Sequence, residues 1–294
     1  MVCEMFLFLI GLFYLTIIIF FNQEASTSVA NACNLFLKVV MPSLISCYFF
    51  GNMLSAGSHI LEKIKKLFFF FPLKNGFIVY LISFVCGFPT TVYLINDLVK
   101  NNELTPAEAN ILIKSCGMCS PVFIFMIFNK GNFPIIYPIF LISSILIYYV
   151  LVGIYYKFKY QQTSTNITNH NFDLFYILNN IPNILLSIFT IMIITNLILI
   201  PLQVFNINLY ITDFLELTTG CNNIINYDFN PFIKLLMIAF LISTGGLCII
   251  LQSISGLKKE MEVSYIHPIS FLFNRLICGI VTTIIFSLFL IFFK

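Results

Sequence analysis

The sequence has no tryptophan and few charged residues. Charged side chains make up 9% of its 294 residues and hydrophobic residues 60%, whereas an ordinary soluble domain carries about 25% charge. The composition therefore predicts an integral membrane protein, partnered by the lipid bilayer, with no room for a soluble catalytic domain. The net charge of +3 is spread thinly along the chain, which excludes a basic face for nucleic acid. Because tryptophan is absent, tyrosine and phenylalanine must form the aromatic belts at the membrane surfaces.

The sequence also lacks the motifs of hydrolytic, ATP-driven and metal-dependent chemistry. It contains no Walker loop, no GxSxG and no HExxH. Its three histidines match no metal-ligand spacing, and the CxxC at 116–119 has neither a βαβ setting nor a second pair of ligands. The nine cysteines lie mostly inside apolar runs and are predicted to be free thiols. We therefore predict no enzymatic activity, no catalytic residues, no metal and no cofactor.

Long apolar runs make up most of the sequence. At roughly 20 residues per spanning helix, the length predicts an all-α polytopic bundle of about six to eight membrane segments. The plainest spans are 5–21, 134–156, 173–200 and 269–293. A cleaved signal peptide is the alternative for the first run, but the start has no positive region, which favours a retained helix followed by a polar loop at 22–28. Residues 32–56 fit a kinked span, a re-entrant element or an interfacial helix.

Two apolar segments in the first half are broken near their middles. They run from about 76 to 99 and from 106 to 128, joined by a polar turn in which Thr105, Pro106 and Glu108 form a strong helix start. The first is interrupted by CGFPTT at 86–91 and the second by CGMCSP at 116–121. Backbone groups freed at membrane depth cost several kcal/mol unless protein, water or a ligand satisfies them. Paired breaks of this kind point to a substrate site in a transporter.

The second half carries a predicted counterpart to these breaks. Residues 213–223 are too polar for lipid exposure, and Ser243-Thr244-Gly245-Gly246 interrupts the run 232–256. A shift of 158 places Gly87 on Gly245, which predicts an internal repeat, although the residue-by-residue match is weak. The predicted division is an N-terminal helix and loop, a first half, a hydrophilic connector and a second half, at 1–31, 32–156, 157–172 and 173–294.

Helix breaks of this type suit an anionic ligand, because unpaired N–H groups and the helix dipole point at it. Glu216 sits in an apolar setting where an uncompensated carboxylate is costly, and it either couples transport to a cation or proton or orders the site; the alternative is an interfacial residue at a helix N-terminus. Arg275, the single arginine, suits a carboxylate ligand; the alternatives are an interfacial anchor and a partner of an acid such as Asp213. Asp97 is predicted to be interfacial. The candidate substrate-binding residues are Gly87, Pro89, Thr90, Thr91, Cys116, Gly117, Ser120, Pro121, Glu216, Thr218, Thr219, Gly220, Asn222, Ser243, Gly245, Gly246, Gln252 and Arg275.

Several motifs together resemble one family. They are VVMPSLISCYFF, CGFPTT, L-T-x-x-E-A, CSPVFIF, LELTTG, STGGLCIILQ and FNRLI, at 39–50, 86–91, 104–109, 119–125, 215–220, 243–252 and 273–277. With these motifs the chain resembles the YlbJ-type sporulation integral membrane proteins, which carry a nucleoside-recognition or Gate domain. The sequence departs from the family pattern at Thr91, where a second glycine is usual, and at Ser120, where an asparagine is usual.

The resemblance implies a fold similar to that of the concentrative nucleoside transporters, in an endospore-forming bacterium. It further implies that the protein passes dipicolinic acid from mother cell to forespore across the outer forespore membrane. A nucleoside or purine carrier and a non-transporting scaffold of the spore envelope are the alternatives. Energy coupling, orientation and oligomeric state stay open, and an oligomer is compatible with the sequence.

Overall fold

The computed structural model describes residues 2–56, 76–100, 104–159, 173–205, 212–260 and 268–293. Every regular element within these ranges is helical. Five helices are long and apolar enough to cross a membrane: Asn22–Met53, Ile136–Tyr155, Leu174–Val204, Pro231–Gly256 and Pro268–Phe292. This confirms the prediction of an all-α polytopic membrane protein. Most of the predicted hydrophilic connector, from 160 to 172, lies outside the described residues.

The chain begins with a short apolar helix and a long one. Helix α1 (Val2–Phe20) contains the apolar stretch Phe8–Phe20, which is shorter than a full span. Helix α2 (Asn22–Leu35), a π-helical turn η1 (Phe36–Val40) and α3 (Met41–Ala56) then follow without a break. The prediction of a polar loop at 22–28 was wrong. The small residues Ala25 and Ala32 are buried along α2, which packs closely against α10, and this packing outweighs the weak helix preference of the surrounding polar residues.

The first half contains the two predicted breaks. Helix α5 (Gly76–Cys86) is followed by α6 (Thr90–Lys100), and α7 (Pro106–Ser115) by α8 (Pro121–Lys130). The predicted cap of α7 is confirmed as a reciprocal capping box between Thr105 and Glu108. Helix α9 (Ile136–Lys159) completes this half.

The second half repeats the order of the first. After the long helix α10 (Leu174–Val204), a break at 214–216 leads to α12 (Leu217–Asn226), and a turn leads to α13 (Pro231–Thr244). A second break separates α13 from α14 (Gly246–Glu260), and α15 (Pro268–Phe292) ends the chain.

The structure favours a different repeat register from the predicted shift of 158. Pro106 and Pro231 both stand at the first turn of the helix between the two breaks of their half, each after a capping residue. They lie 125 positions apart, as 231 minus 106. The shift of 158 aligned Gly87 with Gly245. In the structure, however, Gly87 belongs to the first break of the first half and Gly245 to the second break of the second half.

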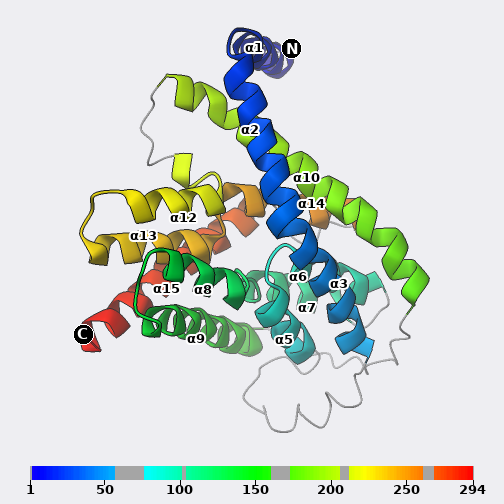
Figure 1. The fold of residues 1–294 in the computed structure, drawn as a ribbon. Coiled ribbons are helices and arrows are strands. Elements are labelled where there is room, and N and C mark those ends of the chain that lie inside the picture. The colour runs from blue at the N-terminus through cyan, green and yellow to red at the C-terminus, as the bar shows by residue number, and fades with distance from the viewer. Residues whose placement is uncertain are drawn as a thin grey trace.

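Three apolar cores organise the described helices, and the smallest joins α1, α2 and α10 through Ile17, Ala25 and Ile200. The largest is formed by α5–α9 and α12–α15, which we call the body. A second is formed by η1, α3 and α10, which we call the outer layer, joined by Tyr93 and Cys248 of the body. Figure 1 shows α10 as a long diagonal helix on one side of the molecule, crossed by α2, with α8, α9, α12 and α13 on the other side.

Candidate substrate site at the crossed helix breaks

The two breaks of the first half are in direct contact. The Phe88 N–H donates to the Met118 carbonyl across 3.0 Å. Gly87 has φ +70, and a Cβ there would lie 2.8 Å from both the Met118 oxygen and the Ser120 nitrogen. Only glycine provides both the backbone conformation and the room for this crossing. The glycine that marked the first break in the sequence is therefore the place where one chain segment passes over the other.

The second half contains an equivalent crossing. The Leu247 N–H donates to the Phe214 carbonyl at 3.0 Å, and the Cys248 N–H donates to the Leu215 carbonyl at 2.9 Å. Gly246 has φ +67. Gly220 packs so closely against the backbone at Asp213 that a Cβ on Gly220 would lie 2.0 Å from the Asp213 carbonyl oxygen. In both halves, backbone groups freed by one break are thus satisfied by the other.

Arg275 joins the two crossings. It projects from α15, is 2% exposed, and donates from Nε to the Thr244 carbonyl at 3.1 Å, from Nη1 to the Gly117 carbonyl at 2.8 Å and from Nη2 to the Ser243 carbonyl. Its guanidinium also lies 4.8 Å from the centre of the Phe88 ring. The carbonyls belong to the C-terminal end of α13 and to the segment just after α7, where helix dipoles are negative. One cation therefore holds corresponding ends of the two halves together.

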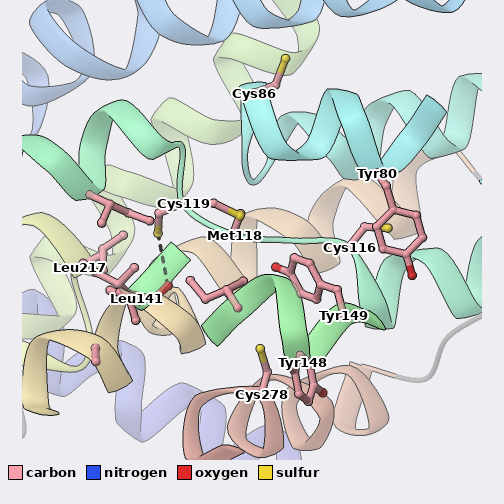
Figure 2. Close-up of a cluster of buried hydrophobic side chains, with 14 of the residues drawn as sticks. Tyr80, Cys86, Cys116, Met118, Cys119, Leu141, Tyr148, Tyr149, Leu217 and Cys278 are labelled. Atoms are coloured by element: carbon pink, nitrogen blue, oxygen red, sulfur yellow. Dashed lines mark hydrogen bonds between the residues drawn. The ribbon is translucent and has the colours of Figure 1, made fainter. Parts of the chain in front are cut away.

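Gly117 is fixed on both sides by this arrangement. Its N–H donates to the Tyr149 hydroxyl at 3.0 Å, while its carbonyl accepts from Arg275. A Cβ at Gly117 would lie 1.6 Å from a ring carbon of Phe88, so the ring occupies the space that a side chain would need. Figure 2 shows Tyr149 beside the unwound segment that carries Cys116, Met118 and Cys119, with the Cys86 thiol pointing away from this cluster.

Protein groups already cap the helix N-termini that the sequence assigned to an anion. Ser120 Oγ accepts from the Phe123 N–H at the start of α8. Glu216 Oε2 accepts from both the N–H and the hydroxyl of Thr219, at 2.6 and 2.7 Å, at the start of α12. Glu216 is 5% exposed and is the N-cap of α12, so the predicted position at a helix N-terminus is confirmed, while its position at the membrane interface stays a prediction. Its position fits the reading in which it orders the site, and its role in coupling stays a prediction.

Some of the other predicted residues belong to the junction around Arg275, and others lie outside its hydrogen bonds. Ser243 is at the junction itself, and its buried hydroxyl has no hydrogen-bond partner among the described residues. Thr91 is buried at the start of α6, where its hydroxyl donates to the Gly87 carbonyl. Gln252 is also buried, but it lies further along α14 and donates to Cys248 Sγ. Residues at the four breaks are thus brought together, whereas Gln252 and the half-buried Asn222 lie beyond the hydrogen bonds of this junction.

Two carboxylates make contacts that the sequence did not predict. Asp97 lies in the last turn of α6, is 4% exposed, and accepts from the Tyr48 hydroxyl at 2.6 Å and the Tyr176 hydroxyl at 3.2 Å. Asp213 does not pair with Arg275; it accepts from Asn223 and Tyr227. Sequence reasoning missed these sites because a tyrosine in an apolar run is indistinguishable from a belt residue until its hydroxyl is seen to meet an acid.

The fold and the site together define a polytopic membrane protein with two pairs of crossed helix breaks fastened by one buried arginine. No protein-family model, curated protein or solved structure matches the chain. In the described part of the chain, no three His, Cys, Asp or Glu side chains are grouped so that they could hold a metal ion.

Proposed function

We propose that the protein is a membrane permease for a small anionic metabolite, and that dipicolinate passing from mother cell to forespore across the outer forespore membrane is its cargo. The observation that carries this proposal is the convergence of the helix breaks of both halves on Arg275. Helices are broken at membrane depth where a polar solute must be bound, and transporters place that site where two repeats meet. The family resemblance of the motifs supplies the identity of the cargo.

The charge of the junction supports an anionic cargo. The described residues place no carboxylate in an ion pair with Arg275. An arginine has five N–H donors, and three hydrogen bonds to carbonyls are described for Arg275, so two donors remain for another acceptor. A buried positive charge that is satisfied only by dipoles attracts an anion more strongly than one neutralised by an acid. Because Arg275 is 2% exposed, an anion would reach it only after the crossings move apart.

Uptake of labelled dipicolinate into proteoliposomes tests this proposal, with labelled nucleoside as the competing cargo. We expect dipicolinate uptake by the wild type and its loss in Arg275→Met, with partial uptake in Arg275→Lys, which keeps the charge but not the planar fork. Thr105→Ala is the matched control, because it removes a helix cap away from the junction. Uptake of nucleoside alone would assign the protein to the nucleoside or purine carriers. Absence of any uptake by correctly inserted protein, together with normal dipicolinate content in spores that lack it, would assign it to a non-transporting scaffold.

A further inference from the structure

The outer layer and the body meet at a boundary between two separate apolar cores. The outer layer has its own apolar core, to which the body contributes Tyr93 and Cys248. From the other side, Cys47 of α3 packs against the core of the body. Regions with separate cores open more easily from each other than within themselves, because fewer buried apolar contacts are lost.

The buried carboxylate of Asp97 lies at this boundary and contacts both α-helices of the outer layer, α3 and α10. Asp97 belongs to α6 of the body, while Tyr48 belongs to α3 and Tyr176 to α10. The Tyr48 hydroxyl donates to Asp97 Oδ2 at 2.6 Å, and the Tyr176 hydroxyl donates to Oδ1 at 3.2 Å. Tyr48 is 1% exposed, so its bond to the carboxylate is shielded from solvent. Hydrogen bonds to an ionised acceptor are roughly twice as strong as those between neutral groups.

Three polar contacts described across the boundary join neutral groups. Helix α10 meets α14 through the hydroxyls of Ser187 and Ser255 at 3.0 Å, and through Thr195 Oγ1, which donates to Cys248 Sγ at 3.4 Å. Helix α3 meets α5 through the Cys86 thiol, which donates to the Cys47 carbonyl at 3.3 Å. These contacts hold the boundary less firmly than bonds to a carboxylate do.

We infer that Asp97 is a clamp that holds the outer layer closed on the body, and that loss of its two phenol hydrogen bonds lets α3 and α10 separate from α6. The clamp is a conformational device of the fold. It does not depend on which cargo, if any, the protein carries.

Native cysteines on the two sides of the boundary report on this opening. Cys47 and Cys86 contact each other where α3 meets α5. Cys119 and Cys278 are 6% and 1% exposed inside the core of the body. Separation of the outer layer exposes the first pair to a thiol reagent and leaves the second pair buried, whereas loss of the whole fold exposes all four.

The experiment measures the rate of maleimide labelling at each of these cysteines by mass spectrometry, on the full-length protein in proteoliposomes. In Asp97→Asn, which removes the charge at equal size, we expect Cys47 and Cys86 to be labelled about tenfold faster or more. In Tyr48→Phe and Tyr176→Phe, which each remove one donor, we expect about a two- to tenfold increase at the same pair. Labelling of Cys119 and Cys278 should stay at the wild-type rate.

Asp213→Asn is the matched control. Asp213 is equally buried and accepts from a tyrosine and an asparagine, but both donors belong to the second half of the chain. This variant should leave Cys47 and Cys86 at the wild-type rate.

Two results would overturn the clamp. One is an unchanged labelling rate of Cys47 and Cys86 in all three clamp variants, and the other is equal acceleration of all four cysteines, which reports global unfolding. If Asp97→Asn does not fold, the two tyrosine variants decide, because each leaves the carboxylate in place. The measurement uses no substrate, so the clamp and the transport proposal can fail independently.

Discussion

A comparison of two glycines tests whether the crossing at Gly87 holds the first half together. Gly87 and Gly245 have similar positive φ angles, +70 and +89, so alanine at either position pays the left-handed penalty of about 1–2 kcal/mol. Their surroundings differ. A Cβ at Gly245 would meet Ile249 Cγ2 at 3.4 Å, which is ordinary contact, whereas a Cβ at Gly87 would meet two backbone atoms at 2.8 Å.

We therefore expect Gly245→Ala to lower the free energy of unfolding by about 1–2 kcal/mol, and Gly87→Ala to lower it by about 3–5 kcal/mol, a range typical of forced overpacking in a core. The larger loss follows because both contacted atoms belong to the backbone, so no side-chain rotation can relieve the overlap, and the Met118 carbonyl is held by its bond to the Phe88 N–H. Reversible unfolding of the two variants in mixed detergent micelles gives both values. Equal losses of unfolding free energy would refute the argument, since they would mean that the backbone at the crossing moves apart to admit a Cβ without a free-energy penalty.

Two further substitutions probe the junction. Arg275→Met leaves the carbonyls of Gly117, Ser243 and Thr244 without their donor. At about 1–3 kcal/mol for each buried group, we expect a loss of about 3–9 kcal/mol in the same unfolding measurement, with Arg275→Lys between it and the wild type. Equal stability of the Met and Lys variants would contradict this. Glu216→Ala removes the cap of α12 and should cost about 1–2 kcal/mol, whereas Glu216→Gln keeps an acceptor for the Thr219 N–H and should cost less. Identical melting curves for the two Glu216 variants would show that the cap does not stabilise the helix.

The arginine at the junction is satisfied in an unusual way for a buried cation. A buried ion pair often gains little, because desolvation of two charges offsets their attraction. Arg275 avoids the second desolvated charge by using three backbone carbonyls, which the breaks would otherwise leave without partners. The cation and the broken helices therefore satisfy each other, and the positive charge of the junction is kept.

The sequence by itself determined the class of protein and the positions of the breaks. Sparse charge and long apolar runs suffice for a membrane bundle, because lipid exposure depends on composition and length. The sequence also predicted the breaks at Gly87 and Gly117 and the cap at Thr105, because glycine, proline and capping residues act on the backbone within a few positions.

Only the tertiary structure decided which segments meet. Arg275 binds Gly117 from 158 positions away, and Asp97 binds tyrosines 49 and 79 positions away. Apolar helices of similar length present no local signal of their neighbours, so sequence reasoning did not find the tyrosine partners of Asp97 and offered Asp213 as a partner of Arg275. The register of the two halves was missed for the same reason. Conspicuous glycines suggested 158, whereas the order of caps, turns and crossings in space gives 125.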